Sequence, residues 1–192
     1  MKYLIAGLGN IGPDYVNTRH NVGFDVADAV ANSLGVPFSS GKKALFAEAR
    51  HKGKQLIIIK PTTFMNLSGE SIRYWMQDQK IARENVLVIA DDLALPFGTL
   101  RMRPAGGAAG HNGLTSIIEC LGTDQFARLR FGIGNNYPKG RQVDYVLGKW
   151  DKEEISFLPE RMAVANDMAK SFVAIGLQMT MNAFNNKSRQ DI

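Results

Sequence analysis

The chain has 192 residues, of which 45% are hydrophobic and 21% are charged, and it carries a formal net charge of +5. This length and composition are typical of one ordinary globular domain and exclude a disordered or fibrous chain. A single cysteine, Cys120, excludes an internal disulfide and indicates a cytoplasmic protein. The apolar stretches fall well short of the ~20 residues that a membrane-spanning helix needs, so we expect no membrane partner.

The first predicted element is a buried strand over residues 3–6, because four apolar residues precede a run of turn-forming ones. No small-residue cleavage pattern follows, so this run predicts a strand and not a signal peptide. A helical pattern begins at Val22 and ends near Gly35. The loop between strand and helix therefore presents Asn10 and His20 from a rigid support.

Three glycines of that loop, Gly7, Gly9 and Gly12, match the spacing of the dinucleotide-binding fingerprint and suggest a nicotinamide or flavin enzyme. In that motif the last glycine opens a helix directly, and an acidic residue follows at the end of the next strand. Here a segment containing a proline delays the helix, and the nearby acids Asp25 and Asp28 fall inside it. The residues therefore disfavour this alternative.

The following part of the chain predicts a loop over residues 37–43 and a hairpin of two strands, 44–50 and 55–60. The second strand ends at a polar segment that contains Asn66, and a helix follows it. Asn66 or Ser68 has the right chemistry to cap that helix. The sequence leaves open whether Asn66 is a plain cap or a functional residue.

A nearly continuous apolar run at 86–90 predicts a strand covered on both faces, and this strand ends at Asp91. Residues 98–103 predict a further strand with basic side chains at alternate positions, followed by a glycine-rich loop. The loop leads into a helix that ends near Gly122. Asn112 lies at the N-terminus of that helix, where backbone amides favour negative charge.

Residues 127–134 predict a final strand, and 145–147 form a short apolar segment. The chain then becomes helical at Asp151, which has capping-box spacing to Glu154. Pro159 is expected to kink this helix or to begin a second one.

The helical segment carries an apolar stripe from residue 155 to residue 175, which we predict to be core. We expect a single domain over residues 1–192, on which the helical segment 151–185 packs. The polar residues 185–191 are expected to form a frayed end.

Three apolar runs, ending near Ala6, Ile59 and Ala90, are each followed by polar residues. If these strands are parallel neighbours in a sheet covered by helices, the polar residues meet at one edge, where open α/β sheets place their ligands. The predicted fold class is therefore α/β.

The polar residues at that edge suit hydrolysis by activated water. The sequence has no serine in a nucleophile elbow, its cysteine lies within a helix, and its three histidines lack metal-ligand spacing, so no metal is expected. His20 is the candidate general base, and Asp91 would fix its tautomer. Asn10, Asn66 and Asn112 would orient water and substrate or stabilise an oxyanion.

Residues 100–150 hold seven basic and three acidic residues, or +4 of the net charge of +5. Such a stretch is often no more than a solvated surface, but it is also what binding of a polyanion requires.

Together these residues carry a resemblance to bacterial peptidyl-tRNA hydrolases. It covers residues 1 to about 150 in order, and the helical end of the chain fits as well. The matching segments are LIAGLGN at 4–10 with TRHNVG at 18–23, KPTTFMNLSG at 60–69, DDL at 91–93, GHNGL at 110–114 and RLRFGIG at 128–134.

The resemblance implies a monomeric cytoplasmic esterase that cleaves peptidyl-tRNA and recycles tRNA from stalled or aborted translation, without a cofactor. The implied fold is a three-layer, phosphorylase/hydrolase-like domain with a twisted, largely parallel mixed sheet between helices. His20 matches the family's catalytic base and Asp91 its supporting carboxylate, and Asn10 matches the residue that discriminates peptidyl-tRNA from aminoacyl-tRNA. The remaining matches are substrate contacts at Tyr15, Phe64, Asn66, His111 and Asn112, a cleft residue at Met65, and tRNA contacts at Arg103 and Arg130.

Two segments depart from the family's pattern. The loop at 105–110 reads Ala-Gly-Gly-Ala-Ala-Gly where many relatives have more glycine or serine, and residues 135–137 also differ. A noncatalytic RNA-binding module, in which His20 and Asp91 are merely structural, remains the alternative function.

Overall fold

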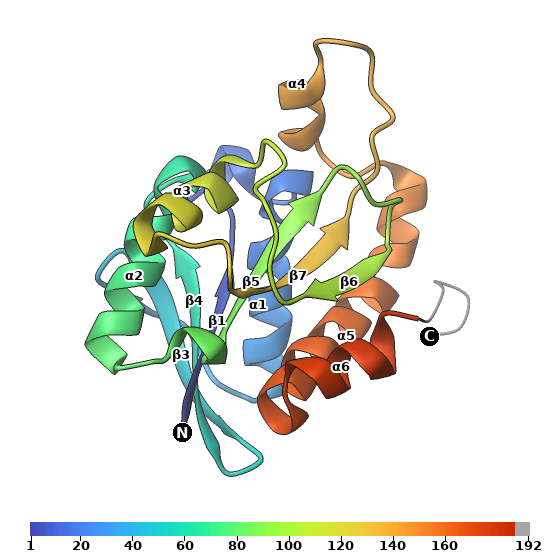
Figure 1. Ribbon diagram of the computed structural model, residues 1–192. Helices are drawn as coiled ribbons and strands as arrows, with labels where there is room; N and C mark the ends of the chain where they lie inside the picture. The colour runs from blue at the N-terminus through green and yellow to red at the C-terminus, as the bar shows by residue number, and fades with distance from the viewer. Residues whose placement is uncertain (187–192) are drawn as a thin grey trace.

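The computed structural model describes residues 1–186, and its centre is one seven-stranded sheet of order β2-β3-β4-β1-β5-β7-β6 (Figure 1). Four neighbouring strands are parallel: β4 (Lys54–Pro61), β1 (Lys2–Gly7), β5 (Val86–Asp92) and β7 (Ala127–Gly132). The other three, β2 (Ser39–Gly41), β3 (Ala44–His51) and β6 (Leu100–Arg103), are antiparallel. The predicted mixed, largely parallel sheet is confirmed.

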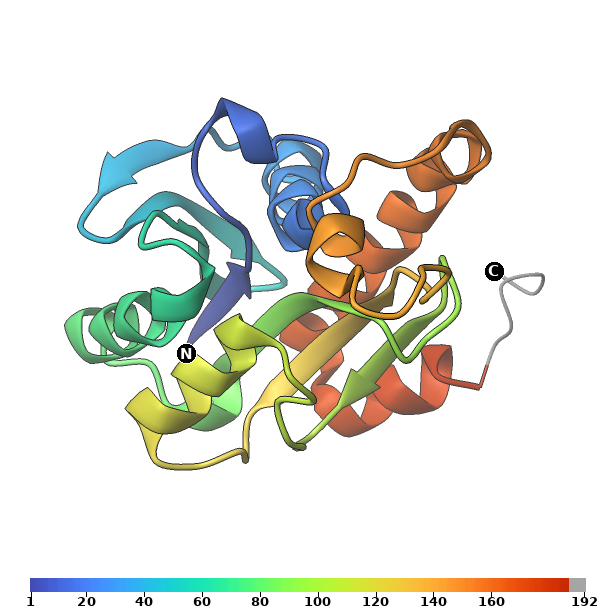
Figure 2. The same ribbon diagram turned by 90° about the horizontal axis from the view of Figure 1, so that it is seen from above.

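Helices cover both faces of this sheet, which makes a three-layer α/β domain (Figures 1 and 2). One face carries α1 (Val22–Ser33), α5 (Lys152–Ile175) and α6 (Leu177–Phe184). The other carries α2 (Ser68–Gln79) and α3 (Asn112–Leu121). No helix of the described residues is long and apolar enough to cross a membrane.

The alternation of side chains along β1 explains why helices are needed on both faces. Ile5 packs in the core beneath α1 and α5, whereas its neighbours Leu4 and Ala6 pack in the core beneath α2 and α3, and all three are fully buried. Because successive residues of a strand point to opposite faces, an all-apolar strand buries its side chains only between two layers.

The first loop is held against the sheet by a close approach of two backbones. A Cβ on Gly7 would lie 2.0 Å from the carbonyl oxygen of Gly23, so α1 packs on β1 at a distance that excludes a side chain. Between them the chain forms two short 3₁₀ helices, η1 (Pro13–Tyr15) and η2 (Arg19–Asn21). Gly12 therefore does not begin an α-helix. In a dinucleotide-binding motif the last glycine does, so the structure agrees with the argument against such a site.

Two local expectations were wrong. The loop expected at 37–43 contains the edge strand β2. The apolar segment 145–147, for which no secondary structure was predicted, lies at the end of a short helix, α4 (Gln142–Val146). Neither Asn66 nor Ser68 caps α2, because a 3₁₀ turn, η3 (Met65–Leu67), leads directly into it and its N-cap is Leu67, whose side chain makes no capping bond.

The C-terminal helices also differ in part from expectation. The predicted capping box of Asp151 and Glu154 is present, but α5 continues through Pro159, and the second helix begins only at Leu177. The middle of the stripe is core, whereas Ile155 at its start and Ile175 at its end are 53% and 54% exposed. Most of the expected frayed end lies outside the described residues, and η4 (Arg83–Asn85) completes the elements.

Candidate active site

The carboxyl ends of the parallel strands gather the predicted polar residues at one edge of the sheet, as expected. Asn10 follows β1, η3 follows β4, and Asp91 is the sixth residue of β5. His20 lies in η2 beside the end of β5, and His111 is the N-cap of α3. This edge is therefore the candidate active site.

Asp91 lies at the centre of the site, between two imidazoles. Its carboxylate oxygens lie 2.9 and 3.0 Å from Nδ1 of His20, and Oδ1 also lies 2.8 Å from Nε2 of His111. The centroids of the two rings are 5.0 Å apart, and Asp91 itself is only 6% exposed. One buried carboxylate thus accepts hydrogen bonds from both histidines.

The hydrogen bonds define which ring nitrogens carry protons. Nδ1 of His111 accepts from the backbone N–H groups of Gly113 and Leu114, at 3.1 and 3.3 Å, so the proton of this ring is on Nε2 and points at Asp91. In His20 the proton is on Nδ1, because that atom faces the carboxylate. Nε2 of His20 has no partner among residues 1–186 and keeps a lone pair for an external proton.

The charge of this cluster is fixed by Asp91. Burial by itself would raise the pKa of Asp91, but the facing His111 and His20 and their hydrogen bonds outweigh it and hold the pKa well below its ordinary value. Asp91 is consequently ionised at neutral pH, which is the state that orients His20.

Arg19, next to His20 in the chain, anchors η2 to the following helices α4 and α5. Its guanidinium donates to Glu154 at 2.9 Å and to the carbonyl oxygen of Tyr145 at 3.2 Å, and lies over the Tyr145 ring at 4.2 Å. Glu154 also accepts from the backbone N–H of Asp151 in the capping box. The sequence reasoning missed this role of Arg19, although the capping-box motif identified one of the partners.

Asn10 is buried beneath the site and is bonded on two sides. Its Oδ1 accepts from the backbone N–H of Met65 at 2.7 Å, and its main chain is paired with the side chain of Asn21 at 2.8 and 2.9 Å. The Nδ2 group of Asn10 has no partner among the described residues and is available to a substrate oxygen. Sequence reasoning did not identify Asn21, which fixes this geometry.

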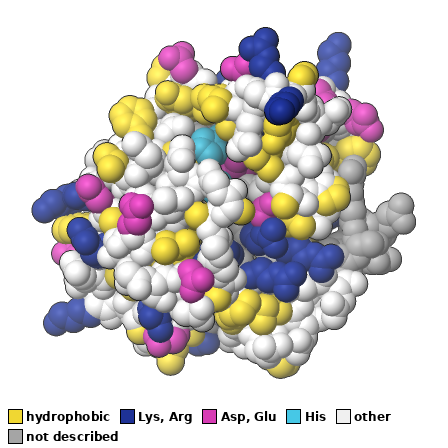
Figure 3. Space-filling view, turned by 45° about the horizontal axis from the view of Figure 1, so that its top comes forward, with side chains coloured by type: hydrophobic (Ala, Val, Ile, Leu, Met, Phe, Trp, Pro, Cys, Tyr) yellow, Lys and Arg dark blue, Asp and Glu magenta, His cyan; other side chains and the backbone are white. Residues whose placement is uncertain are grey.

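A cavity of about 760 Å³ opens on the site, and the space-filling view shows a histidine beside this hollow with Lys and Arg side chains gathered nearby (Figure 3). Its walls are the end of β5, the glycine-rich loop 104–111 and the region around α4. Six predicted residues line it: His20, Asp91, Arg103, His111, Asn112 and Arg130.

The other predicted contacts lie outside the walls of this cavity. Phe64 and Asn66 are exposed beyond the end of β4, and Phe64 has a positive φ of 59°. Tyr15 is half-buried at the end of η1, and Met65 is buried in the core against Gly113. Their roles as substrate contacts stay predictions.

The basic residues of β6 and β7 fall into two kinds. Arg128 is 2% exposed and donates to the carbonyl oxygens of Gly107 and Asp124, so it supports the glycine-rich loop and offers no surface charge. Arg130 is paired with Asp92. Arg103 is exposed at the end of β6 and has no partner among the described residues.

The fold brings together His20 and His111, although their spacing in the sequence gave no indication that they could bind a metal ion together. Ligand atoms of His20, Asp91 and His111 lie within 4.8 Å of one another. The same atoms are joined by the hydrogen bonds described above, and Nε2 of His111 would have to lose its proton to bind a cation. The expectation of a metal-free site stays a prediction.

Comparisons with known proteins bear on this site. The family model for peptidyl-tRNA hydrolase matches residues 4–191. A peptidyl-tRNA hydrolase of Phocaeicola vulgatus is 54% identical over 97% of this chain and its own full length, and one of Porphyromonas gingivalis is 55% identical over 96% of this chain and its own full length. A crystal structure of the peptidyl-tRNA hydrolase of Acinetobacter baumannii has a TM-score of 0.91 at 32% identity, covering 97% of this chain and 95% of that one.

Proposed function

Since the chain belongs to the peptidyl-tRNA hydrolase family, it is an enzyme that hydrolyses peptidyl-tRNA, and we propose that His20 is its general base. The observation that carries this proposal is the hydrogen bond from Nδ1 of His20 to the buried Asp91, which leaves Nε2 of His20 free beside the cavity. The family also disfavours the noncatalytic RNA-binding alternative.

In the proposed first step, Nε2 of His20 takes a proton from water while the water oxygen attacks the carbonyl carbon that joins the peptide to the terminal ribose. Asp91 stabilises the imidazolium that forms, because the negatively charged carboxylate already accepts a hydrogen bond from Nδ1–H of His20. His111 donates a second hydrogen bond to that carboxylate, at Oδ1, and so restrains its rotation.

The oxyanion of the resulting tetrahedral intermediate needs hydrogen-bond donors. The free Nδ2 of Asn10 is one candidate, since its orientation is fixed by the bond from Met65 to Oδ1. Asn112, at the first turn of α3, offers another amide on the cavity wall. In the second step the carbon–oxygen bond to the ribose breaks, and the leaving oxygen takes the proton back from His20.

The substrate's nucleic acid is proposed to lie along the basic side of the cavity, where Arg103 and Arg130 would contact phosphates. Tyr15, Phe64 and Asn66 would contact the peptide or the ester, with Met65 supporting them from below. We also propose that the enzyme acts as a cytoplasmic monomer without a cofactor, and that its role is to recycle tRNA from stalled or aborted translation.

Release of an N-blocked aminoacyl group from tRNA, followed under single-turnover conditions, tests the function directly. We expect the wild-type chain to release the acyl group. A chain that binds this tRNA and releases nothing would support the RNA-binding module instead.

Arg103→Glu is expected to weaken tRNA binding and to leave the chemistry intact. The exposed Arg103 side chain has no internal partner to lose. Its replacement should reduce the magnitude of the slope of log affinity against log salt concentration by about 1, as expected for the loss of one phosphate contact. Affinity is measured by filter binding at several salt concentrations, and chemistry by cleavage of a minimal N-blocked aminoacyl ester of adenosine.

Arg83→Glu is the matched control, because Arg83 is an exposed residue of η4 at the opposite end of β5. This variant makes the same change of charge and should leave both tRNA affinity and ester cleavage unchanged. An equal loss on tRNA and on the minimal ester in Arg103→Glu would instead place Arg103 in the chemistry or the fold.

A further inference from the structure

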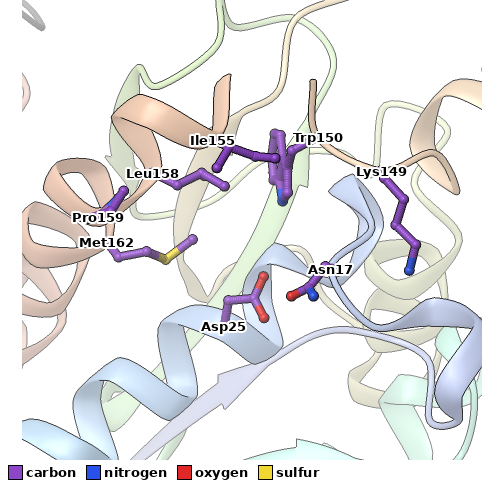
Figure 4. A pocket seen from close by; sticks show the side chains of 8 residues that line it. All are labelled: Asn17, Asp25, Lys149, Trp150, Ile155, Leu158, Pro159 and Met162. Atoms are coloured by element: carbon purple, nitrogen blue, oxygen red, sulfur yellow. The ribbon is translucent and has the colours of Figure 1, made fainter. Parts of the chain in front are cut away.

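A second cavity of about 590 Å³ lies behind the catalytic turn and shares no lining residue with the first. It is formed by the end of the first loop, α1, the two residues before Asp151 and the first turns of α5 (Figure 4). Its size is within the range of small-molecule sites, roughly 300–1,000 Å³. Its lining residues are Asn17, Asp25, Lys149, Trp150, Ile155, Leu158, Pro159 and Met162.

One wall of this cavity is apolar and partly open to solvent. Ile155, Leu158, Pro159 and Met162 all come from the first turns of α5 and lie along one side in Figure 4. Ile155 is 53% exposed, although it begins the stripe that is core further along the helix. Pro159 is also exposed, whereas Leu158 and Met162 are half-buried against the core, so the wall offers a partly exposed apolar surface.

Two polar groups face this space without partners. Trp150 is 7% exposed, and its Nε1 is buried with no hydrogen-bond acceptor among the described residues. The half-buried Asp25 carboxyl has no hydrogen bond or ion pair within the same part of the chain, and Figure 4 shows it facing the space toward which the indole nitrogen points. A buried donor without an acceptor carries an uncompensated desolvation cost, so an acceptor bound at this position would stabilise the site.

The ionisation of Asp25 follows from this position. Burial and, to a smaller extent, the nearby charge of Asp28 together raise the pKa of Asp25 to about 7, against the opposing charge of Lys60. Lys149, the remaining charged residue of the cavity, donates to the carbonyl oxygen of Val16. Because the unfolded-state pKa is about 3.9, the contribution of Asp25 to stability is complete below that pH and is lost as the pH rises to about 7.

Asp25→Asn should therefore raise the midpoint of thermal unfolding by several degrees at pH 8 and leave it nearly unchanged near pH 4. The comparison is made by circular dichroism on both proteins at each pH. Asp28→Asn is the control: it removes a repulsion on Asp25 but also the ion pair of Asp28 with Lys60, so its gain at pH 8 should be smaller than that of Asp25→Asn. An equal gain for Asp25→Asn at both values of pH would show that packing, and not ionisation, is responsible.

We propose that this second cavity binds a small apolar molecule that carries one hydroxyl or primary amide group. The oxygen of such a group accepts the hydrogen bond of the Trp150 indole, and its own O–H or N–H donates to the Asp25 carboxyl. The apolar body covers Leu158, Pro159 and Met162 of α5. One neutral group that both donates and accepts thus satisfies the two unpartnered atoms at once, which neither a simple ether nor an ammonium ion does.

Benzyl alcohol and its isomer anisole test the proposal, because both have the same atoms but only the alcohol donates a hydrogen bond. Binding to the full chain is followed in ¹H–¹⁵N spectra through the two indole N–H resonances. Trp75 is an internal reference, since its Nε1 already donates to the carbonyl oxygen of Lys42 at 3.0 Å. We expect benzyl alcohol to shift the Trp150 resonance saturably and to leave that of Trp75 in place.

Anisole should bind about fivefold more weakly, the expected effect of one lost hydrogen bond. Asp25→Val, which keeps the approximate shape of the side chain, should weaken benzyl alcohol by about the same factor and leave anisole unchanged. Asp167→Val, at an exposed position of α5 outside the cavity, should change neither.

Equal affinities of the wild-type protein for the two isomers would overturn the proposal in favour of an unselective apolar cavity. The absence of any saturable shift of the Trp150 resonance would show that there is no site. Neither result would affect the proposed hydrolase function, whose proposed base and supporting carboxylate, His20 and Asp91, line the other cavity.

Discussion

His20→Ala is expected to lower the rate of peptidyl-tRNA hydrolysis by at least about two orders of magnitude, as the loss of a general base does. His20 is the residue that presents a free ring nitrogen to the catalytic cavity while its other nitrogen is held by Asp91. The rate is measured by single-turnover release of an N-blocked aminoacyl group from tRNA, at equal concentrations of folded protein.

The third histidine provides the matched control. His51 ends β3 at the hairpin turn, remote from Asp91 in the sheet, and His51→Ala should retain the full rate. Affinity for tRNA should survive in His20→Ala, because its basic contacts are untouched. If His20→Ala cleaves as fast as the wild type, the chain remains an esterase but His20 is not its base.

Asp91→Asn should also lower the rate of the chemical step, on the order of 10²-fold and by no more than the loss of His20 itself, because Asp91 acts through His20. The carboxylate accepts hydrogen bonds from Nδ1 of His20 and from Nε2 of His111. The amide of asparagine has only one oxygen that accepts, and an NH2 group that donates. If the amide oxygen keeps the bond to His111, its N–H group faces His20 and favours the tautomer with the proton on Nε2. That tautomer has no lone pair with which to accept a proton from water, as in the wrong-tautomer variants of catalytic triads.

Asp92→Asn separates this effect from a general loss of charge at the edge of the sheet. Asp92 is adjacent to Asp91 but pairs with Arg130, and it makes no contact with either histidine among the described residues. We expect Asp92→Asn to retain most of the rate on a minimal ester. Equal losses in the two variants would mean that the charge of this edge matters and the tautomer of His20 does not.

Much of the catalytic edge could be predicted because it depends on local patterns. Three apolar runs, each followed by polar residues, are sufficient to indicate parallel strands whose ends meet, and the pairing of β1 with β4 and β5 confirms it. The meeting of His20 and Asp91 follows from that arrangement. Signals of this kind survive in a single sequence because strand burial and turn chemistry are local properties.

Other features depend on contacts that no local pattern encodes. In the sequence, His111 is one residue of a glycine-rich loop. The structure places it at the start of α3, where one ring nitrogen caps the helix and the other donates to Asp91. The ion pair of Arg19 with Glu154 joins residues 135 positions apart. The apolar stripe of α5 led us to predict that all its residues are core, but Ile155 in the first turn is exposed and lines the second cavity.

The strand order has a consequence for how the protein is made. β1 leaves the ribosome before the other six strands, yet it lies in the interior of the sheet, and its two neighbours begin only at Lys54 and Val86. In a nascent chain β1 therefore has no neighbour until β4 has emerged, and one of its edges stays unpaired until β5 has emerged. His20, Asp91 and His111 arrive on three separate segments, so a copy whose own synthesis stops before residue 111 lacks the complete cluster proposed to be catalytic. A chain of this family whose own translation is interrupted early is therefore expected to be inactive.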